Sequence, residues 1–455
     1  MGFFLTLLYI ATAYLGPATL FGPLAGAHIG LILAGLVLLV SLPSLQGATI
    51  WKTPQSLALI GLALATFMSL LVTGWAGGAV QVLLDFIPNA YAYFLVCLHC
   101  TSKRKLQILI GVILSVCLFD IANGYYDLQH QPAYLSEEQT PPETPYLLPQ
   151  RSDSGQYIYR IRGQDFIGDP NDFAQVITCV IPLLFFFWRP KRTLKNIAIL
   201  ILPIAALLYG AFLTHSRGSL LGLLAMVLVA SRRRIGTLPA LLLAAALFVA
   251  LSATNYTGGR QISADSGTDR MDLWGEGLDL VKTHPLFGVG YGKMPDNTSN
   301  GLTAHNTVVV CVAELGLFGL YFWSLFLFPT LRDALALASP LKVDEVGPVV
   351  TEAVVLPRAR RATTAIDKAD VNHLGRLVVL SLTGFLVTGW FLSRAFTMTL
   401  FLLGGIVEVV FEMALEHGMT APRLPFARVL RYAGGLTIGL VMLVYVVLRF
   451  GNLMR

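Results

Sequence analysis

The residues best suited to chemistry in this chain lie where polar stretches interrupt long hydrophobic ones. His305 stands at such a boundary, and imidazole is the side chain that exchanges protons near neutral pH. Arg217 and Arg270 stand at two further boundaries. A guanidinium binds phosphate oxygens through paired hydrogen bonds, so both arginines suit an anionic substrate or leaving group. These three residues are therefore the predicted catalytic residues.

Further polar residues occur at the same boundaries, and we expect them to bind substrate. Helix capping explains one or two polar side chains in R-I-R-G-Q-D-F-I-G-D-P-N-D-F-A at 160–174, but not two arginines with three acids. A lone acid inside an apolar run, such as Glu314, is expected to serve function or to pair with an arginine. The predicted substrate-binding residues are Arg160, Arg162, Asp169, Asn171, His215, Asn306 and Glu314.

Local structural roles are the alternative at two of these positions. The apolar segment 219–230, which follows Arg217, would measure about 18 Å as a helix. Because this is too short to cross a bilayer, we expect Arg217 to lie below the outer surface and to face a cavity or a partner. The alternative is an arginine that extends to the lipid headgroups. For His305 the alternative is a solvated residue at the start of a helix.

The segment around Arg270 predicts an amphipathic helix at the membrane surface. Ser266 and Asp269 have the spacing of a capping box, which would place Arg270 in the first turn. The helix dipole disfavours a cation there, so an anionic partner is expected. The predicted apolar stripe consists of Met271, Trp274, Leu278 and Val281.

The elements that must position these residues are membrane-spanning helices. Hydrophobic residues make up 55% of the chain and charged residues only 13%. Apolar runs of about 20 residues recur along the whole length, and each is long enough to cross a bilayer as a helix. The sequence therefore predicts an all-α polytopic membrane protein with about 12–13 transmembrane helices. The expected spans are 3–20, 28–45, 56–74, 79–100, 106–123, 172–188, 196–213, 219–230, 237–253, 306–331, 374–394, 397–415 and 429–449.

The distribution of lysine and arginine predicts the orientation of these spans. The basic clusters at 103–105, 189–192, 232–234 and 358–368 fall on one side, which the positive-inside rule makes cytoplasmic. This bias accounts for the net charge of +6, so no nucleic-acid partner is predicted.

Residues 1–455 are expected to form a single integral membrane domain. Its outer loop is 124–171, its large outer loop with the amphipathic helix is 254–305, and its cytoplasmic connector is 332–373.

Several other functions find no support in the sequence. The five cysteines lie in or beside apolar spans, so no disulfide framework is predicted, and Cys97-Leu98-His99-Cys100 has no second pair to complete a metal site. The glycines of G-V-G-Y-G at 288–292 follow no strand, which excludes a nucleotide-binding motif. No metal and no cofactor is predicted.

Together these motifs resemble those of the O-antigen ligase and O-antigen polymerase superfamily of bacterial membrane glycosyltransferases. The resemblance covers residues 155–325. It rests on D-P-N-D-F-A at 169–174, T-H-S-R-G at 214–218, R-M-D-L-W and H-P-L-F-G-V-G between 270 and 290, and H-N with E-L-G-L-F-G from 305 to 319.

The resemblance implies a glycosyltransferase-C-like membrane fold in the bacterial inner membrane, with a periplasmic helical loop. It implies that a glycan moves from polyprenyl diphosphate, such as undecaprenyl diphosphate, to a sugar hydroxyl of a glycan, lipid or protein acceptor. The active site would face the periplasm and need no metal, and the product would be a cell-surface polysaccharide such as lipopolysaccharide. Arg217 and Arg270 would hold the diphosphate, and His305 would accept the hydroxyl proton. Ligation and polymerisation both stay open.

A transporter of polysaccharide or of lipid-linked glycan is the alternative function. Arg217, Glu314 and the short helix expected at 219–230 are typical of transporters with broken helices. Such transporters usually contain related halves, which this sequence lacks, and the large outer segments favour an enzyme.

Overall fold

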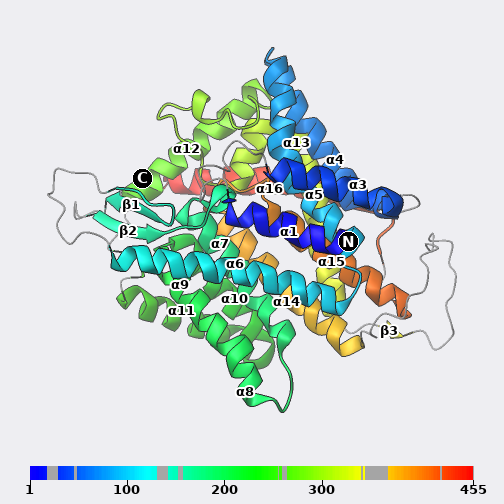
Figure 1. Ribbon diagram of the computed structural model, residues 1–455. Helices are drawn as coiled ribbons and strands as arrows, with labels where there is room; N and C mark the ends of the chain where they lie inside the picture. The colour runs from blue at the N-terminus through cyan, green and yellow to red at the C-terminus, as the bar shows by residue number, and fades with distance from the viewer. Residues whose placement is uncertain are drawn as a thin grey trace. The chain divides into compact units, whose positions relative to one another are not determined.

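The structure is a computed structural model that describes residues 1–17, 29–45, 49–130, 142–151, 157–254, 256–258, 264–339, 342–343, 367–420 and 423–453. Parts of the predicted loops 124–171 and 254–305 and of the connector 332–373 lie outside the described residues. Within the described residues the chain is almost entirely helical, which confirms the predicted all-α class (Figure 1). Nine of the described helices are long and apolar enough to cross a membrane, so the protein is a multi-pass membrane protein.

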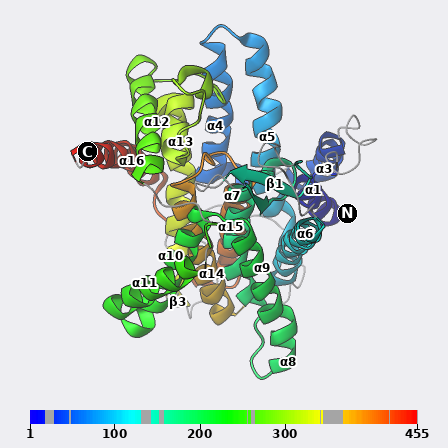
Figure 2. The same ribbon diagram turned by 90° about the vertical axis from the view of Figure 1, so that its left-hand side faces the viewer.

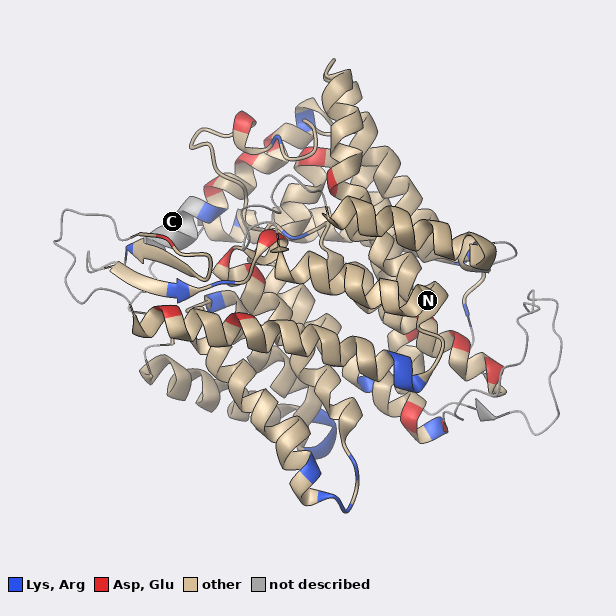
Figure 3. Cartoon of the chain, in the orientation of Figure 1, with Lys and Arg blue, Asp and Glu red and all other residues tan. Residues whose placement is uncertain are grey.

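Each of the thirteen predicted spans corresponds to a helix. Charged side chains gather at helix ends and in connections, and the long central stretches of the helices carry few of them (Figure 3). The chain divides into two compact units, which are described separately. Unit 1 contains Met1–Pro43, His99–Gln261 and Leu377–Thr388, and unit 2 contains Ser44–Leu98, Ile262–Arg376 and Gly389–Arg455.

Unit 1 is a helical bundle with one small hairpin. The helix α6 packs against α1 and α9, α7 packs against α9 and α10, and α10 packs against α11. Strands β1 and β2 pair in antiparallel fashion from Leu147 opposite Ile161 to Arg151 opposite Tyr157, a hairpin that the sequence did not predict. The elements are α1 (Gly2–Leu15), α3 (Ile29–Leu45), α6 (Lys103–Gln129), β1 (Leu147–Arg151), β2 (Tyr157–Ile161), η3 (Asp165–Ile167), α7 (Pro170–Leu184), α8 (Thr193–Asn196), α9 (Leu202–Leu213), α10 (Arg217–Ile235) and α11 (Thr237–Ala253).

Unit 2 is built around one long buried helix, α13. It packs against α4, α12, α15 and α16, and Figure 2 shows α12 beside it. Its core includes the fully buried rings of Trp323, Phe326 and Phe401. The elements are η2 (Thr49–Lys52), α4 (Pro54–Leu71), α5 (Ala76–His99), α12 (Ala264–Thr283), η6 (Pro295–Asn297), α13 (Thr307–Ala338), β3 (Lys342–Val343), α14 (Lys368–Gly389, whose second half belongs to unit 1), α15 (Met398–Glu416), β4 (Met419–Thr420) and α16 (Phe426–Leu453).

The helix α13 is interrupted at Gly316, where φ is 66° and ψ is −169°. In an unbroken helix the carbonyls of Ala313 and Glu314 would accept from the N–H groups four residues later, those of Leu317 and Phe318. Here these four groups bond instead to the segment 285–290, which we call the glycine loop.

The glycine loop gives a new partner to each of the four backbone groups that lose a helical hydrogen bond. The N–H groups of Val289 and Gly290 donate to Ala313 and Glu314, each at 3.0 Å. The N–H groups of Leu317 and Phe318 donate to Pro285 at 2.8 Å and to Leu286 at 3.1 Å. Because unsatisfied backbone groups are costly inside a membrane, this pairing makes the interruption tolerable there.

Two predictions about helix ends were wrong. The helix α10 has 19 residues, or about 28 Å, and not the short limb expected at 219–230. It continues through Arg232, Arg233 and Arg234, whose charges favour the C-terminal end of a helix. The helix α12 begins at Ala264, so Arg270 lies in its second turn and the expected capping box lies inside the helix.

The interruption of α13 predicts a strong requirement for glycine at position 316. A Cβ atom there would lie 2.2 Å from the carbonyl oxygen of Leu286, on a backbone with positive φ. We expect Gly316→Ala to lower the free energy of unfolding by more than about 3 kcal/mol, because strain and a backbone clash add. Denaturation of the purified protein in detergent measures this change.

Gly439→Ala is the matched control. Gly439 lies in α16 of the same unit, and a Cβ there meets nothing within 4 Å. We expect a change within about 1 kcal/mol, in the stabilising direction. Equal losses in the two variants would contradict the described break.

Candidate functional site

The predicted site residues fall into both units. Unit 1 holds Arg160, Arg162, Asp169, Asn171, His215 and Arg217, and unit 2 holds Arg270, His305, Asn306 and Glu314. Within unit 1 the structure joins Arg160 to Asn171 and to the turn that holds His215, and it joins Asp169 to Asn171. The convergence of Arg217 with Arg270 and His305 on one cavity stays a prediction.

Arg160 is the centre of the set in unit 1. It is 2% exposed, at the end of β2. Its Nε donates to the carbonyl of Thr214 at 2.6 Å, its Nη1 to Gln150 Oε1 at 2.7 Å, and its Nη2 to Asn171 Oδ1 at 2.8 Å. These contacts tie the hairpin, the start of α7 and the turn before α10 to one guanidinium. Arg160 therefore supports the turn, and contact with substrate stays a prediction for it.

The other members of R-I-R-G-Q-D-F-I-G-D-P-N-D also hold local structure. Asp169 is the N-cap of α7, and its Oδ1 accepts from the N–H of Asn171 at 2.7 Å. Arg162 donates through Nη2 to the carbonyl of Thr144 at 2.8 Å and lies 3.2 Å from Glu143 Oε2. Capping and turn formation thus account for the described contacts of these residues.

The turn T-H-S-R-G opens α10. Ser216 is the N-cap and accepts from the N–H of Ser219 at 3.4 Å, so that Arg217 is the first helical residue and is half-buried. His215 has a φ of +50°, and its Nδ1 lies 2.9 Å from the carbonyl oxygen of Tyr256. Because a carbonyl only accepts, Nδ1 carries the proton, and Nε2 is the acceptor in the neutral ring.

Tyr256 is a site residue that the sequence did not reveal. It is 3% exposed, and its hydroxyl lies 2.9 Å from Ser219 Oγ. Burial raises the pKa of Tyr256 to about 12, so the hydroxyl stays protonated near neutral pH. The segment 256–258 thus fixes the His215 ring, and no periodicity marks it in the sequence.

Asp120 is a second residue that the sequence analysis missed. This acid of α6 is fully buried, and neither carboxyl oxygen has a hydrogen-bond partner among the described residues. A Cβ on Gly163 would lie 3.2 Å from its Oδ2, so it lies beside the outer segment that Arg160 organises. Its signal is a lone acid inside a span, the same signal that marks Glu314.

In unit 2, His305 is exposed between two buried neighbours, Ala304 and Asn306. The carbonyl of Ala304 accepts from Trp274 Nε1 of α12 at 2.8 Å. The side chain of Asn306 caps α13, and its Oδ1 accepts from the N–H groups of Val308 and Val309 at 2.9 and 3.1 Å. His305 therefore projects from a point that is fixed on both sides, which suits a proton acceptor.

The segment between α14 and α15 also contacts the start of α13. Its residues 390–394 were predicted to belong to the span 374–394, but α14 ends at Gly389. Asn306 Nδ2 donates to the carbonyl of Trp390 at 3.0 Å, and Thr307 Oγ1 donates to the carbonyl of Leu392 at 2.8 Å. The N–H of Arg394 donates to Thr307 Oγ1 at 3.3 Å. The backbone of Arg394 thus lies against Thr307, two residues after His305 in the sequence.

Arg270 lies on α12 and is half-buried. The helix packs against α13 and α16, with Leu273 and Trp274 buried. Trp274 is one of the four residues of the predicted apolar stripe of this helix, and it is buried. Gly277 lets α12 approach closely, because a Cβ there would lie 2.4 Å from Val309 Cγ1.

Glu314 is tied to the connection that leads from the glycine loop to His305. The backbone N–H groups of Gly292 and Met294 lie near its carboxylate, and the N–H of Gly290 donates to its carbonyl at 3.0 Å. Glu314 thus contacts this connection through both its side chain and its main chain. Neither an arginine nor His305 is among its described partners.

Backbone strain coincides with three of the predicted patches. Among the described residues, the non-glycine residues with positive φ are Asp165, Lys191, His215 and His305. All except Lys191 belong to the predicted polar patches. Such conformations cost about 1–3 kcal/mol each and gather at functional sites, so their placement favours a site here.

No group of three or more His, Cys, Asp or Glu side chains within the described part of the chain could hold a metal ion. Metal independence of the reaction stays a prediction.

A family model described as O-Antigen ligase matches residues 202–324, which include Arg217, Arg270, His305 and Glu314. A search of curated proteins finds no match to the chain.

The contacts of Arg160 predict that lysine cannot replace it. A lysine reaches one of the three acceptors that the guanidinium joins, so we expect Arg160→Lys to lower the free energy of unfolding by about 3 kcal/mol. Arg162→Lys is the control, since it lies two residues away in the more exposed pair with Glu143, and we expect less than about 1 kcal/mol. Denaturation in detergent measures both, and a smaller loss at position 160 than at 162 would contradict the supporting role.

Proposed function

We propose that this member of the O-antigen ligase and polymerase superfamily transfers a glycan from polyprenyl diphosphate to an acceptor sugar hydroxyl. The chain is a membrane glycosyltransferase of the O-antigen ligase and polymerase type. The observation that carries the proposed reaction is the exposed His305, held in a strained conformation between a capped helix and the anchored Ala304. The donor, the acceptor and a periplasmic site in the bacterial inner membrane belong to the proposal.

The proposed reaction is one displacement at the anomeric carbon. The acceptor oxygen forms the new glycosidic bond while the bond from the sugar to the diphosphate breaks. His305 accepts the hydroxyl proton, and the polyprenyl diphosphate leaves with the bonding electrons. Arg217 and Arg270 stabilise the growing negative charge with paired hydrogen bonds, so the step needs no metal ion. Arg394 is a further cation for the same purpose, because its backbone lies against Thr307.

A transfer assay separates this function from transport. Purified full-length protein is mixed with a polyprenyl-diphosphate glycan and an acceptor in the presence of a chelator. The proposal predicts glycan transfer without an energy source. Movement of the donor across liposomes without transfer would support the transporter instead.

Replacement of His305 by asparagine tests its chemical role. Asparagine tolerates positive φ better than alanine does, so His305→Asn removes the imidazole and keeps the backbone. We expect turnover to fall about 10²- to 10⁴-fold with donor affinity nearly unchanged, because a proton acceptor acts in the chemical step. His284→Asn, at another exposed histidine of the same unit, should keep full turnover. Normal turnover in His305→Asn would remove His305 from the mechanism.

Arginine-to-lysine exchange tests the phosphate contacts. Lysine keeps the charge but loses the planar fork, so Arg217→Lys and Arg270→Lys should each reduce turnover about 10²-fold. The control is Arg104→Lys, at an exposed residue of a basic cluster predicted to be cytoplasmic, which should retain activity. Steady-state rates at saturating donor measure the effect, and full activity of both site variants would contradict the assignment.

A further inference from the structure

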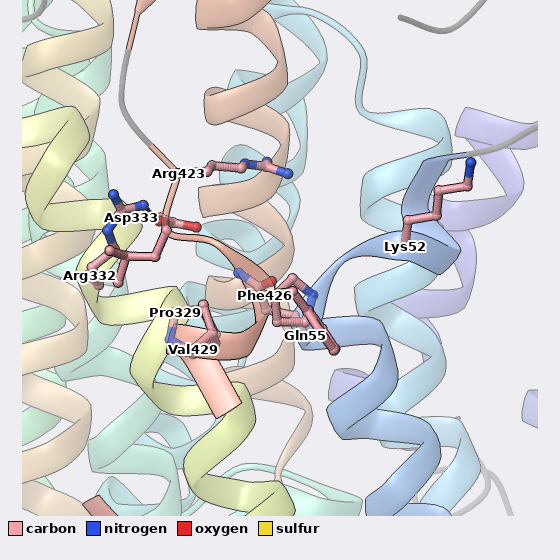
Figure 4. A pocket seen from close by; sticks show the side chains of 10 residues that line it. Lys52, Gln55, Pro329, Arg332, Asp333, Arg423, Phe426 and Val429 are labelled. Atoms are coloured by element: carbon pink, nitrogen blue, oxygen red, sulfur yellow. Dashed lines mark hydrogen bonds and ion pairs between the residues drawn. The ribbon is translucent and has the colours of Figure 1, made fainter. Parts of the chain in front are cut away.

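A cavity of about 150 Å³ lies in unit 2, and none of the predicted catalytic residues lines it (Figure 4). Three helix ends and one connecting segment surround it: the starts of α4 and α16, the last part of α13, and the segment that follows α15. All four are on the predicted cytoplasmic side. The cavity therefore lies where the headgroups of the inner leaflet are expected.

Basic side chains dominate the polar lining. Lys52, Arg332 and Arg423 line the cavity from three separate elements, against one acid, Asp333. Figure 4 shows Arg332 beside Asp333 and Lys52 on the opposite side. Lys52 forms no ion pair within the part of the chain that the structure describes.

The ion pairs present leave donors for a ligand. Arg332 contacts Asp333 through Nη1 at 2.5 Å. Arg423 contacts Glu408 at 2.7 Å and Glu412 at 3.6 Å, both through Nη2. A guanidinium has five N–H donors on three nitrogens, so each arginine retains donors beyond its ion pair.

A buried amide in the same lining lacks a hydrogen bond. Gln55 is 1% exposed, and its Nε2 makes no hydrogen bond of normal geometry, although it lies near the Asp333 carboxylate. Buried amide donors are normally satisfied, so an acceptor in the cavity would remove this cost. The remaining lining is apolar and includes Pro329, Phe426 and Val429.

We propose that this cavity binds a phosphate group, supplied by the headgroup of an anionic phospholipid or by a soluble phosphate compound. A phosphate offers acceptor oxygens to the guanidinium donors that the ion pairs leave, to the Lys52 ammonium and to Gln55 Nε2. The apolar lining suits the glycerol and the upper acyl carbons of a lipid, and basic pockets between helices on this side of a membrane bind such headgroups. Neither the glycan donor nor the acceptor is involved, so the site is independent of the transfer reaction.

Native mass spectrometry of the delipidated full-length protein tests this site. Phosphatidylglycerol, zwitterionic phosphatidylcholine and glycerol phosphate are titrated separately. The variants are Lys52→Glu, and Arg332→Gln with Asp333→Asn, which removes an ion pair without leaving a buried charge. The control is Arg431→Gln, at an exposed arginine of α16 that does not line the cavity.

We expect one tightly bound phosphatidylglycerol, with affinity reduced about fivefold or more in each variant and unchanged in the control. Binding of glycerol phosphate that depends on the same residues would identify a soluble source and uphold the phosphate site. Lys52 is exposed, so Lys52→Glu decides the matter even if the double variant fails to fold. Equal binding of every ligand by the native protein and Lys52→Glu, or no binding at all, would overturn the proposal.

Discussion

The structure of unit 2 depends on four backbone hydrogen bonds between the glycine loop and the interrupted helix α13. Four backbone groups of α13 lose their helical partners at Gly316, and backbone groups of the glycine loop replace them. The groups of α13 belong to Ala313, Glu314, Leu317 and Phe318, and those of the loop to Pro285, Leu286, Val289 and Gly290. Only glycine fits at 288 and 316, because a Cβ at either would lie within 2.3 Å of the opposite backbone. The constraint is therefore mutual, since neither segment can keep its shape in a membrane without the other.

This pairing connects the strained histidine to the rigid core. The segment of α13 before the break starts at the Asn306 cap and ends at Glu314, whose carboxylate lies near the backbone N–H groups of Gly292 and Met294. The connection from those residues returns to Ala304, which Trp274 anchors. Hydrogen bonds therefore hold the residues on both sides of His305, Ala304 and Asn306, and His305 can stay exposed in a strained conformation between them.

The sequence was sufficient for the features that depend on composition and local spacing. Thirteen apolar runs became helices, and capping accounts for a polar residue before α7, as the sequence indicated for the segment 160–174. Sequence reasoning failed for features in which contacts join segments that are distant in the chain. Three features leave no periodic signal, because each is defined by partners far away in the chain. They are the hairpin at 147–161, the three acceptors of Arg160 and the contacts of the segment 390–394.

The length of α10 was underestimated because Arg232–Arg234 were read as a loop, although basic residues favour the last turn of a helix. The motifs H-P-L-F-G-V-G and E-L-G carry part of the family resemblance, and in the structure their main chains pair with each other.

From the sequence we predict that Arg217 of unit 1 and His305 of unit 2 serve one outer site. Cross-linking of introduced cysteines at these two positions tests it directly, with a short bifunctional thiol reagent applied to intact cells. Four of the native cysteines are buried and Cys97 is half-buried, so the introduced pair should react first. We expect a cross-link between positions 217 and 305, and none when position 217 is exchanged for 232 at the other end of α10. Failure of the first pair to cross-link, while each single cysteine reacts with the reagent, would contradict a shared site.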